Sequence, residues 1–114
     1  MKKQQFHRTS LLDNYKPQLN NSICELIKRR RRQMMVHSYI YYRLGTSIID
    51  DYTFDKWAYE LKDLQNKYPL ESQYTELYEE FKDWDGSTGF NLDTYLFSHI
   101  AERLLRSKNE YTKI

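Results

Sequence analysis

Apolar side chains recur at the 3.6-residue period of an α-helix along most of the chain after residue 20. The first such segment ends at Gly45, and its apolar side is formed by Ile23, Leu26, Ile27, Met34, His37, Tyr41 and Leu44. Ser22 and Glu25 have the spacing of a capping box, in which side chains satisfy the first backbone N–H groups of a helix. Because Gly45 is a typical stop signal, the pattern predicts a first helix of about six turns.

Three further amphipathic segments follow. The second is expected to begin at Asp50 or Asp51, whose carboxylates suit a helix N-terminus, and to end before Pro69. Its inward positions are Phe54, Trp57, Ala58, Leu61, Leu64 and Tyr68. The third has Leu70, Tyr74, Leu77, Tyr78, Phe81 and Trp84 inward. The fourth is capped by Asn91 or Asp93 and has inward Leu92, Tyr95, Leu96, Ile100, Leu104 and Leu105.

No segment shows the alternation typical of a β-strand, and three Gly and two Pro are too few for the turns of a β-sandwich. The fold class is therefore predicted as all-α, a small single-domain bundle of one helical hairpin and two further helices. Its 114 residues suit one domain. Residues 1–20 are polar and contain Pro17, which predicts an irregular N-terminal arm, residues 21–108 form the domain, and residues 109–114 a tail.

The start of the chain, MKKQQFHRTS, lacks the apolar stretch of a signal peptide, and no apolar run reaches membrane-spanning length. The single cysteine, Cys24, agrees with a reducing compartment. We therefore expect a cytoplasmic protein with no membrane partner. His7, His37 and His99 lack the spacing of metal ligands, so no metal site and no catalytic residue are predicted.

Charge is separated along the chain although the formal net charge is only +2. Residues 1–45 carry ten Lys or Arg and two acids, whereas residues 46–99 carry four and twelve. A basic side could attract nucleic acid or an acidic protein, or the two charged halves could simply face each other.

The run Arg29 to Arg32 cannot share one helix face, because consecutive residues step by about 100°. Arg30 falls on the apolar side and is expected to bury its stem or to pair with a carboxylate of a neighbouring helix. Arg29, Arg31 and Arg32 remain for solvent or for a partner. So few phosphate-reaching charges predict weak nucleic-acid binding at cellular salt.

The segment HSYIYYRLGTSIIDDYTFD places an aromatic-rich helix end and a carboxylate cluster on either side of a turn. His37-x-Tyr39-x-Tyr41-Tyr42, eight residues, Asp51-x-x-Phe54-Asp55-x-x-x-x-Glu60-Leu61 and Tyr68-Pro69 together resemble the N-terminal domain of NAD-dependent DNA ligases. The resemblance covers residues 37–69 and part of the helix before them.

In that family a helical hairpin with these motifs closes over the nicotinamide mononucleotide half of NAD. The resemblance implies that the corresponding contacts here are Tyr41, Tyr42, Asp51, Phe54 and Asp55. The family has a tyrosine at the position of Phe54, so one hydroxyl is absent, at a cost to binding of about 1 kcal/mol. The turn could equally serve only to hold two helices together, since Asp51 and Asp55 suit the first turn of any helix.

The family transfers AMP through the lysine of a K-x-D-G motif in a separate domain. The nearest string here, KDWDG from Lys82 to Gly86, has one residue too many before the Asp-Gly pair. We therefore expect no ligation and no required cofactor.

Two functions remain open. One is a ligase-related, non-catalytic binding or regulatory module for nicotinamide mononucleotide or NAD. The other is an interaction protein, of the kind encoded by phages and other mobile elements, which inhibits a host defence or nucleic-acid enzyme through its charged faces in the host cytoplasm. A protein partner is expected, but the sequence does not identify it.

Overall fold

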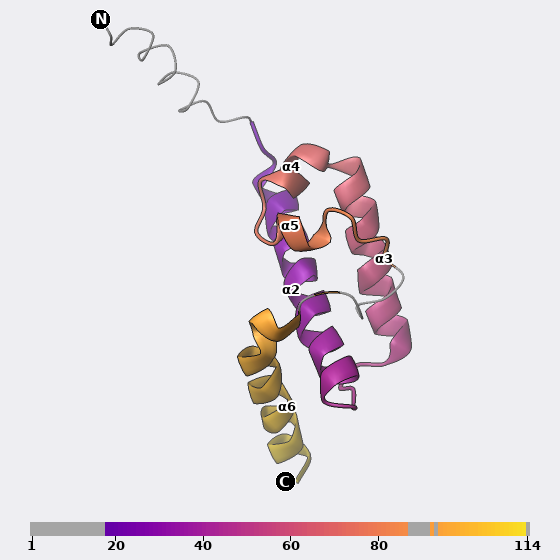
Figure 1. Ribbon diagram of the computed structural model, residues 1–114, viewed down its shortest axis with the longest axis vertical. Coiled ribbons are helices and arrows are strands. Elements are labelled where there is room, and N and C mark those ends of the chain that lie inside the picture. Colours follow the sequence, from indigo (N-terminus) through magenta and orange to yellow (C-terminus); the bar gives the residue numbers. More distant parts are fainter. Residues whose placement is uncertain (1–17, 87–91, 93, 114) are drawn as a thin grey trace, which may run out of the picture.

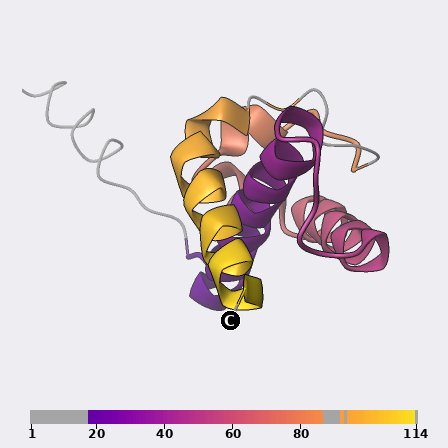
Figure 2. The same cartoon turned by 90° about the horizontal axis from the view of Figure 1, so that it is seen from below.

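The computed structural model describes residues 18–86, 92 and 94–113, and all regular elements in these ranges are helical. In chain order they are α2 (Asn21–Arg43), α3 (Asp51–Lys67), α4 (Pro69–Gln73), α5 (Tyr78–Phe81), the 3-10 helix η1 (Thr94–Phe97) and α6 (Ser98–Lys113). Helices α2 and α3 form an antiparallel hairpin, and α6 packs on the opposite side of α2 from α3 (Figures 1 and 2). The predicted all-α bundle built on a hairpin is confirmed.

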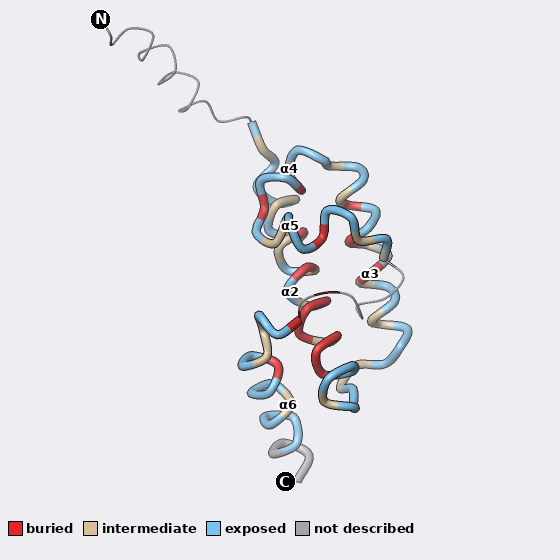
Figure 3. Tube along the Cα trace, viewed as in Figure 1, coloured by how far each residue is buried: buried red, intermediate tan, exposed pale blue. Residues whose placement is uncertain are grey.

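Helix α2 is central because it buries side chains on two sides. One core cluster joins it to α3 and to the segments after α3, and consists of Ile27, Met34, Met35, Ala58, Leu61, Leu64, Phe81 and Leu92. A second joins it to α6 through Val36, Tyr39, Ile40 and Ala101. In Figure 3 the buried positions accordingly follow α2, whereas most of α6 is exposed.

The ends of the hairpin are set by local hydrogen bonds. Asp50 is the N-cap of α3, and its Oδ1 accepts from the Thr53 N–H at 2.8 Å. Gly45 follows the last residues of α2 with φ +70°, a conformation that favours glycine. The cap at Asp50 and the stop at Gly45 both agree with the helix ends predicted from the sequence. The predicted capping box at Ser22 is wrong, because the N-cap is Asn20, whose Oδ1 accepts from the N–H groups of Ser22 and Ile23.

The third predicted helix is broken into α4 and α5, and Arg31 binds the backbone of this segment. This side chain is fully buried. It donates from Nη1 to the carbonyl oxygens of Thr75 (3.0 Å) and Glu76 (2.9 Å), and from Nη2 to the carbonyl oxygen (3.1 Å) and Oγ (2.6 Å) of Ser72. After these residues Leu77 takes a left-handed conformation with φ 72°, where the helix is interrupted. The prediction that Arg31 faces solvent or a partner is therefore wrong.

The inward side of α6 also differs from the prediction. Its buried residue is Ala101, whose small side chain lets α6 approach α2 closely. Of the six predicted inward positions, Leu92 is buried and Leu105 half-buried, while the others are exposed: Tyr95, Leu96, Ile100 and Leu104. The proposed caps Asn91 and Asp93 lie outside the described residues.

The described residues begin just before α2, so most of the expected arm, residues 1–20, lies outside them. At the other end α6 continues past residue 108, the expected domain end, to Lys113. None of the helices in the described ranges has the length and apolar character needed to span a membrane.

Candidate functional site

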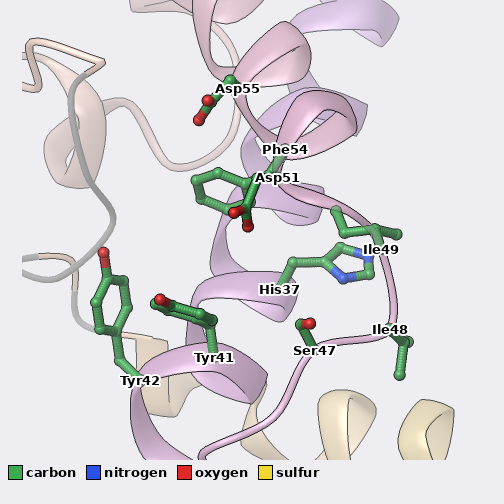
Figure 4. Close-up of a pocket in the computed structure, with 9 residues that line it drawn as sticks. All are labelled: His37, Tyr41, Tyr42, Ser47, Ile48, Ile49, Asp51, Phe54 and Asp55. Carbon is green, nitrogen blue, oxygen red and sulfur yellow. The ribbon is translucent and has the colours of Figure 1, made fainter.

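A pocket of about 240 Å³ lies where α2 ends and α3 begins (Figure 4). Its wall is built from the last turns of α2, the connecting loop and the first turns of α3. The lining residues are His37, Tyr41, Tyr42, Ser47, Ile48, Ile49, Asp51, Phe54 and Asp55. All five residues that the sequence proposed as ligand contacts are among them, although their role in binding stays a prediction.

Helical spacing explains how these side chains reach one place. On α2, His37 and Tyr41 are four residues apart and therefore lie on the same face. On α3, Asp51 and Asp55 have the same separation, and Phe54 lies three residues after Asp51. The tight end of α2 at Gly45 and the cap at Asp50 turn these two faces towards each other.

Tyrosines 41 and 42 form the aromatic edge of the pocket. Their rings meet edge to face, with centroids 4.8 Å apart and planes at 87°. Tyr41 is 54% exposed, so its ring is accessible from solvent. In Figure 4 both side chains lie across the opening from Phe54, and an aromatic surface of this kind can receive a flat ring.

The two carboxylates of the pocket, Asp51 and Asp55, are exposed. Within the described part of the chain, neither Asp51 nor Asp55 makes a hydrogen bond or an ion pair. Asp50 differs, because its carboxylate caps α3, and the hydrogen bonds from Thr53 lower its pKa. The pocket therefore offers two carboxylates to hydroxyl donors or to a cation.

His37 lies at the inner side of the pocket. Its ring packs against Trp57, with centroids 5.7 Å apart, and its Nδ1 is buried with no hydrogen-bond partner among the described residues. Burial lowers the pKa of His37, so the ring is neutral at pH 7. The sequence placed His37 in the core stripe, yet its i−4 relation to Tyr41 was a usable sign that it borders the same site.

The motif that the sequence analysis used did not single out the other lining residues, Ser47, Ile48 and Ile49. They belong to the connecting loop, and the path of that loop depends on how the two helices pack.

The arginine run does not form the expected basic face. Arg29 is exposed, Arg31 is buried, and Arg32 pairs with Glu76 through Nε–Oε1 (2.8 Å) and Nη2–Oε2 (3.0 Å) contacts. Arg30 behaves as predicted: its Nε lies 2.7 Å from Glu60 Oε1 on α3. Of the three expected partner-facing arginines, Arg29 is the one that is exposed without an ion pair to the described residues.

Among the described residues, no group of three His, Cys, Asp or Glu side chains is placed to hold a metal ion. Cys24 is a half-buried free thiol on α2.

A stretch of 48 residues is 44% identical to a DNA ligase of Flavobacterium johnsoniae. The match covers 42% of this chain but only 7% of that ligase. The chain therefore contains a ligase-related segment. No protein-family model matches the chain. No solved structure matches it.

Proposed function

We propose that this protein is a ligase-related, non-catalytic module that binds nicotinamide mononucleotide, either free or as part of NAD. The observation that carries the proposal is the meeting of Tyr41, Tyr42, Asp51, Phe54 and Asp55 around one pocket. These residues come from two helices, and the resemblance to the ligase N-terminal domain implied them as ligand contacts. The 48-residue match to a DNA ligase supports the ligase-related part of the proposal.

The chemistry of the pocket suits a pyridinium nucleoside. A positively charged pyridinium ring is attracted to aromatic faces, which Tyr41, Tyr42 and Phe54 supply. Unpaired carboxylates accept hydrogen bonds from ribose hydroxyls and favour the positive ring. The same carboxylates repel phosphate, so we expect the ring and the ribose to enter the pocket and the phosphate to stay in solvent.

The volume sets a limit on the ligand. At about 240 Å³ the pocket is slightly smaller than most small-molecule sites, which span roughly 300–1,000 Å³. It can take the nicotinamide riboside part of a ligand, whereas the adenosine half of NAD would extend beyond it. We therefore expect nicotinamide mononucleotide to bind at least as well as NAD.

Several features support a binding role without ligation. The chain has no K-x-D-G motif. Lys82, the lysine of the nearest string, does not line the pocket and pairs with Glu79 at 2.8 Å. The alternative of a macromolecule held by the arginine run is disfavoured, because Arg31 is buried and Arg32 is paired.

Isothermal titration calorimetry tests the proposal. Nicotinamide mononucleotide should bind the wild type, and Tyr41→Ala or Asp51→Ala should abolish the heat. The matched control is Asp63→Ala, which removes an exposed carboxylate of α3 that does not line the pocket.

A second ligand separates charge recognition from simple ring stacking. Reduced nicotinamide mononucleotide has the same size but an uncharged dihydropyridine ring, so it should bind more weakly. Absence of heat with the oxidised nucleotide for the wild type and for Phe54→Tyr would reject the proposed function and leave the turn as a structural element.

A further inference from the structure

Helix α6 and the turn before it expose a line of aliphatic side chains that the core does not use. Leu96, Ile100 and Leu104 are 57%, 48% and 40% exposed. Among the described residues only one other aliphatic side chain of this size is as exposed, Leu70 on α4. Three of four such side chains thus fall on one segment at intervals of four residues.

The packing of α6 explains why this line stays in solvent. Ala101 faces α2, and Glu102 Oε2 accepts a hydrogen bond from Tyr39 OH at 3.1 Å. These contacts fix the rotation of α6, so that the side bearing Ile100 and Leu104 points away from α2. Figures 1 and 2 show α6 attached along one side only.

Basic residues lie beside the line and at its end. With about 100° per residue, Arg103 lies about 60° to one side of Ile100, and Lys108 follows Leu104 by four residues and so continues the line. Both are exposed, and Arg106 adds a further exposed cation beyond Arg103. The helix contains two acids: Glu102 is held towards α2 by Tyr39, and Glu110 lies near the end of the helix, beyond Lys108. The surface is therefore an apolar seam with a basic rim.

We propose that this surface, Leu96, Ile100 and Leu104 with Arg103 and Lys108 at its rim, docks an amphipathic helix of a protein partner whose apolar seam is flanked by carboxylates. Side chains four residues apart form the ridge that packs into the grooves of another helix. A basic rim selects an acidic partner and raises the association rate. The proposal uses none of the pocket residues and does not depend on the ligand proposed above.

Charge disfavours the other occupants. A second copy of α6 packed in parallel would bring the two Arg103 side chains together. The first 17 residues of this chain carry four Lys or Arg and one Asp, so they do not complement the rim either. A lipid surface would favour a broad apolar face, whereas a narrow seam is typical of contacts between helices.

The test uses two synthetic helical peptides with the same leucine seam, flanked by glutamates in one and by lysines in the other. Fluorescence anisotropy with the full chain should show binding of the glutamate peptide, weakened by salt, and at least about tenfold weaker binding of the lysine peptide. Ile100→Ala and Leu104→Ala should each weaken binding about tenfold or more. Leu70→Ala, a control of equal chemistry and 41% exposure, should leave it unchanged.

The proposal would be overturned by equal affinity for both peptides or by no binding of the glutamate peptide. It would also be overturned if Ile100→Ala had no effect, or if the protein bound phosphatidylserine vesicles more tightly than the glutamate peptide. Sedimentation velocity adds a fifth such result, a dimer that Ile100→Glu dissociates, since this would identify a second copy as the occupant. Melting temperatures of all variants should match the wild type, because the substituted side chains are exposed.

Discussion

Replacing Arg31 by alanine should strongly destabilise the fold, although its neighbours in the arginine run should tolerate the same change. Burial lowers the pKa of Arg31 to about 10, so the guanidinium remains charged at pH 7 and keeps all its donors. Three of its hydrogen bonds, to the carbonyl of Thr75 and to the carbonyl and Oγ of Ser72, are fully buried.

The magnitude follows from the acceptors that the substitution leaves behind. Each buried acceptor without a donor costs about 1–3 kcal/mol, and water or small movements recover part of this. We therefore expect Arg31→Ala to lower the free energy of unfolding by about 3–5 kcal/mol, a large share of the roughly 5–15 kcal/mol typical of a domain. The melting temperature should fall by roughly 15–30 °C. Arg31→Lys should also destabilise the fold, because an ammonium group cannot replace the planar guanidinium and its fork of N–H donors.

The comparison variants are Arg29→Ala and Arg32→Ala. Arg29 is exposed and should have no effect. The Arg32–Glu76 pair is 48% and 43% exposed, so its loss should cost only about 0–1 kcal/mol. Urea denaturation followed by far-ultraviolet circular dichroism measures all of these. If Arg31→Ala unfolded within about 1 kcal/mol of Arg29→Ala, the buried guanidinium would not organise the segment after α3.

Three further predictions concern the pocket and its chemistry. Phe54→Tyr should tighten nicotinamide mononucleotide binding by about 1 kcal/mol, roughly fivefold, as measured by calorimetry, and unchanged affinity would show that the family's hydroxyl has no partner here. The chain should form no covalent AMP adduct when incubated with NAD, and a mass increase equal to adenylate on Lys82 or any other residue would contradict this. His37 has a pKa below its ordinary value of about 6.5, so its contribution to stability is complete above that pH and is lost as the pH falls. The melting temperature should therefore drop between pH 7 and 5, by less in His37→Gln, and equal pH dependence in both proteins would exclude His37 as the cause.

The hairpin could be predicted from the sequence because its signals are local. Asp50 caps α3 through a residue three positions later, and Gly45 ends α2 by its own conformational freedom. The five pocket residues were grouped by the resemblance to the ligase N-terminal domain, and they line one pocket because their spacing on two helices joined by a short turn decides which faces meet.

The other features depend on distant residues. The burial of Arg31 requires carbonyl groups more than forty positions later in the chain, which no periodicity reveals. The orientation of α6 was mispredicted because the pattern follows large apolar side chains, whereas the close contact with α2 is made by Ala101. The large side chains Ile100 and Leu104 are left on the outside, where they form the surface proposed for a partner.

A titration of the isotopically labelled protein with nicotinamide mononucleotide, followed residue by residue by amide NMR shifts, tests the central claim most directly. The account predicts progressive, saturable shifts concentrated at Tyr41, Tyr42 and residues 47–55, little change along α6, and loss of the response in Asp51→Ala. No shifts at millimolar nucleotide, or shifts centred away from the junction of α2 and α3, would contradict it.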